Sequence, residues 1–328
     1  MASRKTSERR SGANRSDNGG GEGRGPVRVH VPVLPEESLR AMALERGCTV
    51  VDGTVGAGGH SELFCAELGA EGLLIGLDRD AEILGHALKR LFDQPRNGGP
   101  RIELRHAAHA ELESVLTELG LPHVDRVFLD LGVSSLQLDS PERGFSFMRD
   151  APLDMRMDPT RDRIPASDWL MRVRKDELER VLRDYGGERF APRIASAIVE
   201  ARRMHPIERT SQLAELCVRA TPGRFRHGRI HAATRSFQAI RIAVNDELGH
   251  LERGLEAAWE SLCVGGRLVV LSFHSLEDRI VKSFLKDRTR ERTRSPERAT
   301  EAEVASNSRS RSAKLRFGVK PSESGALS

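Results

Sequence analysis

A glycine-rich turn between two apolar strands carries the most specific chemistry in this chain. The strand Val50-Val51-Asp52 runs into Gly53-Thr54-Val55-Gly56-Ala57-Gly58-Gly59-His60, and a second apolar run, 73–77, ends in Asp78. Glycine lets a ligand approach bare backbone. Asp78 follows Gly59 by 19 residues, close to the ~20 that separate such a loop from the carboxylate that accepts both ribose hydroxyls. The pattern predicts a nucleoside-cofactor site on an open parallel sheet. The alternative, a glycine turn without a ligand, leaves the pairing with Asp78 unexplained.

The residues of the loop also indicate which cofactor it would bind. A dinucleotide fingerprint needs G-x-G-x-x-G, but Ser61 stands at the place of the third glycine. Asp52 lies in the approach to the loop, where a carboxylate repels a pyrophosphate and attracts an ammonium group. S-adenosylmethionine has an α-amino group, a sulfonium and no phosphate, so the loop favours this cofactor.

A second carboxylate, Asp130, stands at the end of the apolar strand at 126–131 and is expected at the same sheet edge. Methyl transfer from a sulfonium is an in-line displacement, so catalysis consists mainly of positioning and a proton acceptor. The exocyclic amine of a base is a poor nucleophile because its lone pair is delocalised into the ring. Asp130 is the candidate catalytic residue that would hold its N–H groups, and the neighbouring backbone carbonyls are the alternative.

Aromatic and basic side chains farther along are candidates for the substrate. Phe145 and Phe147 could sandwich a flipped base, or they could pack between two domains. His274 follows the strand at 267–272 and faces the same edge, either as a substrate contact or as an ordinary hydrogen-bonding histidine.

Composition excludes several classes of protein. The net charge is +4, and the four cysteines are scattered without a C-x-x-C pair, which argues against structural zinc and fits a reducing compartment. No apolar run approaches the ~20 residues of a membrane span, and the N-terminus lacks the apolar core of a signal peptide. We expect a cytoplasmic protein without a metal or a membrane partner.

The order of predicted elements indicates an α/β fold. Strands are expected at 49–51, 73–77, 102–104, 126–131, 267–272 and 313–319, with helices such as 81–92 and 110–119 between them. This alternation is typical of a doubly wound, Rossmann-like sheet. From 167 to about 220 the pattern is helical only: one helix is capped by Ser167, a second ends before Pro206 and a third ends before Pro222.

The domain prediction follows from that interruption. An α/β domain is expected from 30–140 and 235–320, and an inserted helical domain, which would recognise the substrate, from 141–234. Residues 286–311 alternate basic and acidic side chains and are predicted to be a charged linker. Residues 1–29 are predicted to be a disordered tail, and 321–328 a second tail.

An acid-free window points to a nucleic-acid partner. No acidic residue lies between Glu215 and Asp246, and the loop in this window contains Arg224, Arg226 and Arg229 around Phe225. Such a loop suits phosphate and base contacts. The alternative is a solvated basic loop.

Long motifs in the chain resemble the RsmH (MraW) family, the ribosomal RNA small subunit methyltransferases H. The resemblance spans about 29–285 plus 312–317, and its most specific parts are 142–150 and 272–279. It implies a class I methyltransferase domain with an inserted helical domain. The implied activity is N4-methylation of a decoding-centre cytidine in 16S ribosomal RNA, from S-adenosylmethionine, with small-subunit ribosomal RNA, within the small subunit, as the partner. The family's cofactor contacts correspond to Gly58, Gly59, His60, Asp78, His109, Asp130 and Gln137.

Three positions depart from the family pattern: His109 stands where an aromatic such as Phe is expected beside the adenine, Leu136 replaces a Pro, and Gly56-Ala57 differs slightly from the usual loop. Two other functions stay open. One is methylation of DNA or another RNA base, although Asp130-Leu131-Gly132-Val133 lacks the Pro-Pro-aromatic run of DNA amino-methyltransferases, so DNA is not the expected partner. The other is an RNA-binding assembly factor without turnover.

Overall fold

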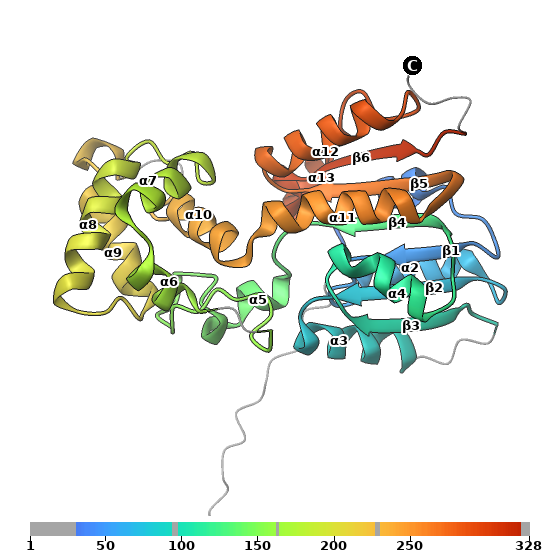
Figure 1. Ribbon diagram of the computed structural model, residues 1–328, viewed down its shortest axis with the longest axis horizontal. Coiled ribbons are helices and arrows are strands. Elements are labelled where there is room, and N and C mark those ends of the chain that lie inside the picture. Colours follow the sequence, from blue (N-terminus) through green and yellow to red (C-terminus); the bar gives the residue numbers. More distant parts are fainter. Residues whose placement is uncertain (1–30, 94–97, 162–163, 227–229, 323–328) are drawn as a thin grey trace, which may run out of the picture.

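The chain forms a sheet covered by helices and, beside it, a separate group of helices (Figure 1). This computed structural model describes residues 31–93, 98–161, 164–226 and 230–322. The predicted tail at 1–29, and residues 323–328 of the tail predicted at 321–328, therefore lie outside the described residues. Among the described residues, no helix is long and apolar enough to cross a membrane.

The sheet has six strands in the order β3-β2-β1-β4-β5-β6. Five strands are parallel and β6 runs antiparallel to β5. The bounds are β1 (Thr49–Asp52), β2 (Leu73–Asp78), β3 (Arg101–His106), β4 (Val124–Asp130), β5 (Leu262–Ser272) and β6 (Lys314–Val319). Every strand expected from the sequence is present, and the α/β, Rossmann-like methyltransferase fold is confirmed.

Both faces of the sheet are buried, as successive strand residues show. Val50 packs with α1 (Pro35–Met42), α2 (Gly59–Leu68) and α3 (Ala81–Phe92), whereas Val51 packs with residues of the other face. That face is covered by α4 (Leu112–Glu118), α11 (Glu247–Ser261) and α12 (Ser275–Arg288). Side chains alternate along a strand, so these apolar runs bury both faces and direct the carboxyl ends of the parallel strands toward one edge.

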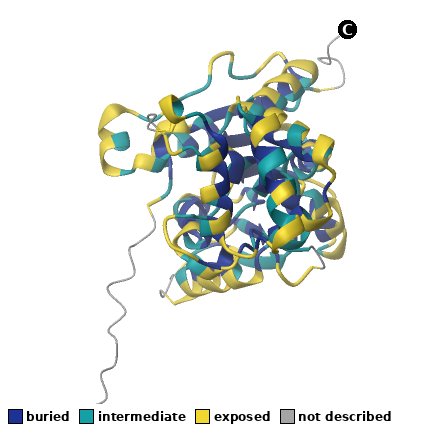
Figure 2. Cartoon of the chain, turned by 90° about the vertical axis from the view of Figure 1, so that its left-hand side faces the viewer, coloured by how far each residue is buried: buried dark blue, intermediate teal, exposed yellow. Residues whose placement is uncertain are grey.

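The inserted helices have a core of their own. They are the connecting helix α5 (Ser135–Asp139), then α6 (Ala166–Arg172), α7 (Lys175–Asp184), α8 (Ala191–Met204), α9 (Thr210–Ala220) and α10 (Thr234–Asn245). Leu170, Leu182 and Ile194 are fully buried in this core. Figure 2, which views the molecule from this end, shows the buried residues gathered inside and the exposed ones on outer turns.

Two predictions about this region are wrong in detail. The helix expected to begin at the cap Ser167 is two helices, because the extended backbone of Val173 and Arg174 separates α6 from α7. The predicted boundary at 234 also falls too early. Phe237 and Ile240 of α10 belong to the helical core, and the chain turns into α11 only at Asp246, whose φ of 47° ends α10. The helical core therefore extends to about residue 245.

The charged segment 286–311, predicted to be a charged linker, is partly helical and is bridged to the sheet. It contains the end of α12, then α13 (Glu301–Ser306) and the 3-10 turn η4 (Ser308–Ser312). Single bridges join Arg292 to Gly318 and Glu297 to Leu315 of β6, and Glu303 Oε1 accepts a hydrogen bond of 2.8 Å from Leu34 N. Because these bridges involve backbone atoms, they produce no periodic pattern of hydrophobic residues from which the sequence could predict them. The segment closes one side of the cavity described next.

Candidate active site

A cavity of about 490 Å³ lies at the carboxyl edge of the sheet, between the sheet and the helical core. This volume is in the ~300–1,000 Å³ range of small-molecule sites. The structure brings most of the predicted site residues to its wall: Gly59, His60, Asp78, His109, Asp130, Gln137, Phe145, Phe147 and His274. Gly58, Arg224 and Arg226 are not among the lining residues, and Arg229 lies outside the described residues.

Neighbouring residues of the glycine loop have different roles: one packs against a helix, and the next two face the cavity. Gly58 has φ of 82°, and a Cβ there would lie 3.4 Å from Leu91 and 3.5 Å from Ala87 of α3. Its backbone conformation, which other residues rarely adopt, therefore serves close helix packing. Gly59 and His60, which begin α2, are the residues that face the cavity.

Two buried carboxylates hold this loop through backbone groups. Asp78 accepts hydrogen bonds of 2.9 Å from Gly56 N and from Asp80 N. Asp52 accepts one of 2.6 Å from Ser61 Oγ and one of 3.2 Å from Thr54 N. Burial raises the pKa of both carboxyls to about 6, against the hydrogen bonds that lower it. Both are therefore ionised at pH 7, and only Asp78 lines the cavity.

Asp130 is fixed at the centre of the edge by its neighbours. Its backbone N donates to Thr54 Oγ1 at 2.6 Å, and its Oδ2 lies 3.4 Å from His60 Nδ1. The other ring nitrogen of His60 donates to Val33 O at 2.9 Å. Burial lowers the pKa of His60, but the hydrogen bond and charge of Asp130, with the charge of Asp52, outweigh it and raise the pKa. The two side chains therefore form a pair at the edge of the sheet.

His109 forms a neutral, planar part of the wall. Burial, followed by the charges of His250 and Arg79, lowers its pKa to about 4. Its ring packs so closely on α11 that a Cβ at Gly254 would clash with it. Nε2 of His109 is buried and has no hydrogen-bond partner among the described residues. Cδ2 and Nε2 form the ring edge that faces Gly254, so this nitrogen is turned toward α11, although His109 is one of the residues that line the cavity.

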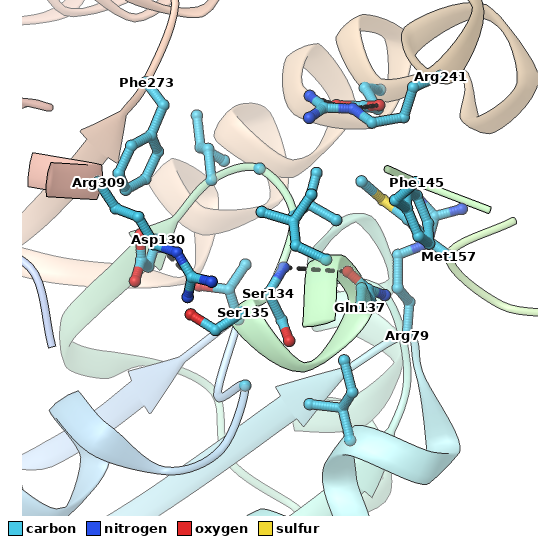
Figure 3. Close-up of a pocket in the computed structure, with 18 of the residues that line it drawn as sticks. Arg79, Asp130, Ser134, Ser135, Gln137, Phe145, Met157, Arg241, Phe273 and Arg309 are labelled. Carbon is cyan, nitrogen blue, oxygen red and sulfur yellow. Dashed lines mark hydrogen bonds and ion pairs between the residues drawn. The ribbon is translucent and has the colours of Figure 1, made fainter. Parts of the chain in front are cut away.

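Gln137 lines the cavity, but both ends of its amide are already bonded. Its Oε1 accepts from Ser134 N at 3.0 Å, as Figure 3 shows, and its Nε2 donates to Asp80 Oδ2 at 2.8 Å. Arg143 donates to the same Asp80 oxygen at 2.7 Å. Asp80 also caps α3, so this buried group ties the helical insertion to the sheet. Neither Asp80 nor the role of Arg143 was predicted from the sequence, since nothing in their spacing pairs them.

The opposite wall comes from the helical core. Phe145 is buried in that core, and Phe147 packs on Phe237 and His231 with ring centroids 4.8 and 4.7 Å apart. Both rings do face the cavity, so domain packing and substrate contact are not exclusive. Residues at helical spacing on α10 line the same wall: Thr234, Phe237, Gln238 and Arg241.

His274 lies in a polar group at the far end of this wall. It caps α12, and its Nε2 lies 3.1 Å from Glu277 Oε1. Glu247 is near both, since one ligand atom of each of the three residues lies within 4.8 Å of the others. Arg241 donates two hydrogen bonds of 2.7 Å to Glu247. A guanidinium therefore already balances the acidic charge, and the group is complete as a salt-bridged cluster.

Arg224 and Arg226 of the acid-free window lie elsewhere, on the surface of the helical domain. Arg224 and Arg189 place their guanidinium carbons 4.9 and 5.1 Å from the ring centre of Phe225. Arg226 donates to Thr221 O at 2.9 Å. The result is an exposed basic and aromatic surface, which we call the Phe225 patch: Arg189, Arg224, Phe225 and Arg226.

Comparison with known proteins shows the family of this chain. The MraW methylase family matches residues 28–320. The chain belongs to this family. Two curated relatives, both named Ribosomal RNA small subunit methyltransferase H, support the assignment. That of Nitratidesulfovibrio vulgaris is 46% identical over 92% of this chain and 88% of its own. That of Thioalkalivibrio sulfidiphilus is 48% identical over 89% and 97%.

Among solved structures, an rRNA methylase from Streptococcus thermophilus matches with a TM-score of 0.41 and 12% identity, over 90% of this chain and 100% of its own. The protein is a methyltransferase with S-adenosylmethionine as its cofactor, which confirms the cofactor and the family expected from the sequence.

Proposed function

We propose that this chain methylates N4 of a decoding-centre cytidine in small-subunit ribosomal RNA. The observation that carries the proposal is one cavity with two different walls: a nucleoside-type loop with buried carboxylates, and an aromatic wall from the inserted helices, with Asp130 between them. The relatives named above are ribosomal RNA small subunit methyltransferases, which supports a base in RNA as the acceptor.

The residues of the first wall fit S-adenosylmethionine, the methyl donor. The cavity has room for a ligand of this size, and Asp78 and His109 are among its lining residues. Asp78 would accept the ribose hydroxyls, and His109 would lie against the adenine. Gly59, His60 and Asp130 would surround the methionine end, where the carboxylates favour the ammonium and the sulfonium.

Asp130 is the proposed catalytic residue. Its carboxylate would accept a hydrogen bond from the exocyclic amine of the target, which concentrates the nitrogen lone pair for attack, and it would take up the proton that the amine loses. His60 lies beside this carboxylate and orients it. The bond between Asp130 N and Thr54 fixes the backbone at the same point.

The second wall would receive the base. A base inside a folded RNA must leave its stack to reach such a cavity, and aromatic rings compensate the lost stacking. Phe147 and Phe237 are the proposed stacking surface. We propose the Phe225 patch as the contact for neighbouring phosphates, because its arginines are exposed and flank an aromatic ring.

The test is mass spectrometry of small-subunit ribosomal RNA from a strain that lacks this protein. N4-methylcytidine at the decoding centre should disappear and return with the wild-type chain. Asp130→Asn should not restore it, whereas Asp176→Asn, an exposed carboxylate on α7, should. Persistence of the mark in the deletion strain would contradict the proposed substrate. Full restoration by Asp130→Asn would contradict only the role of Asp130.

A further inference from the structure

Arg309 brings a positive charge from the C-terminal segment to the cavity. It lies in η4 and is a lining residue together with Ser312. Figure 3 shows its side chain pointing toward Asp130, Ser134 and Ser135. It reaches this place because β6 runs antiparallel to β5. Lys314, the first residue of β6, pairs with Ser272 at the end of β5, so the segment before β6 lies at the carboxyl edge of the parallel strands.

The backbone around Arg309 is firmly held. Asn307 Oδ1 caps the turn by accepting from Arg309 N at 3.3 Å, and Ser310 is fully buried with its Oγ donating to Asn307 O at 2.8 Å. Glu303, one turn earlier, bonds the backbone of Leu34 at 2.8 Å. The backbone of such a turn is held in place before a ligand binds, which lowers the entropy cost of binding.

Among the residues that the structure describes, the guanidinium of Arg309 has only a weak partner. Its Nη2 lies 3.3 Å from both carboxylate oxygens of Asp139, whose side chain is 72% exposed. Solvated pairs of this kind contribute little, so the guanidinium can bind another anion without losing a strong bond. Arg241, in contrast, is occupied by its two 2.7 Å bonds to Glu247.

We propose that Arg309 binds the carboxylate of the methionine part of S-adenosylmethionine. This part carries an ammonium and a carboxylate side by side, and the cavity offers Asp130 and Arg309 side by side (Figure 3). A planar guanidinium suits a carboxylate because it can donate two parallel hydrogen bonds. The inference rests on the proposed placement of the cofactor. It adds to the cofactor site a residue from the C-terminal segment that was expected to be a linker.

The experiment is calorimetry on Arg309→Gln with three ligands. S-adenosylmethionine and S-adenosylhomocysteine carry the carboxylate, whereas 5′-methylthioadenosine keeps the adenosine and sulfur but lacks the amino-acid part. We expect about tenfold weaker binding of the first two, as for one lost charge-assisted bond, and unchanged binding of the third. Arg309→Lys should lose less than Arg309→Gln. Arg311→Gln, an exposed neighbour that does not line the cavity, is the control and should bind all three like wild type.

Two outcomes would overturn the inference. Equal weakening of 5′-methylthioadenosine would mean that the variant distorts the whole site. Unchanged binding of all three ligands would remove Arg309 from the cofactor site. In that case, a flatter salt dependence of RNA binding would assign it to a phosphate. Failure of the cofactor placement itself is distinguishable, because Asp78→Ala would then also bind S-adenosylmethionine like wild type.

Discussion

The two walls of the cavity are held in place by different kinds of interaction. On the sheet side, Asp52, Asp78 and Asp130 are fixed by bonds with neighbouring loop residues. On the helical side, Phe147 and Phe237 are held by packing within a separate core. The first wall is set by local loop geometry, and the second by how the inserted helices fold. Changes on the sheet side should therefore alter cofactor binding and chemistry, whereas changes on the helical domain should alter RNA binding.

The largest effect should come from Asp130→Asn, at the junction of the two walls. The variant keeps the shape of the side chain but cannot take up a proton, so we expect single-turnover methylation to fall about 10²- to 10⁴-fold. Affinity for S-adenosylmethionine should fall much less. Quench-flow at saturating cofactor measures the first quantity and calorimetry the second. A rate near wild type would shift the catalytic role to the backbone carbonyls beside residue 130.

Asp78→Ala should act on the sheet wall alone. It removes charge-assisted hydrogen bonds to the ribose, worth about 1.5–3 kcal/mol, so the affinity for S-adenosylmethionine should fall roughly 10- to 150-fold. RNA binding should not change. Unaltered cofactor affinity in a folded variant would contradict the ribose assignment.

The pH dependence of binding provides the internal control for Asp78. Its folded-state pKa is raised to about 6 by burial, so the carboxylate is protonated below that pH and must lose the proton to accept both ribose hydroxyls. Wild-type affinity should therefore weaken as pH falls below 6, by up to about tenfold per unit. Asp78→Ala should show a flatter profile. Identical profiles would assign the titration to another group, such as Asp52.

The sequence predicted the sheet wall better than the helical wall, for a physical reason. Parallel strands end at one edge, so Gly59, Asp78 and Asp130 had to meet there once the strands were recognised. No such rule places Gln238, which reaches the cavity only through the packing of α10 on the helical core. Arg309 was missed because its segment is a charged run whose bridges to β6 involve backbone atoms. Asp80 and Arg143 meet across the two parts of the fold, which spacing cannot reveal.

The smallest effect, and the test of the helical side, concerns the Phe225 patch. If Arg224 and Arg226 contact phosphates, changing both to Gln should weaken RNA binding and leave cofactor affinity intact. Each lost contact should flatten the log–log salt slope by ~0.7–0.9, so the pair should change it by about 1.4–1.8. Between 50 and 200 mM salt, the wild type should then lose about 7- to 12-fold more affinity than the variant.

The matched control is Arg172→Gln with Arg174→Gln, exposed arginines paired with Asp168 and Asp176. It removes the same net charge from the same helical domain, so an equal change of slope in both variants would mean that overall charge, and not the Phe225 patch, attracts the RNA. A slope like wild type in the first variant would leave the aromatic wall of the cavity as the helical domain's proposed contact with RNA.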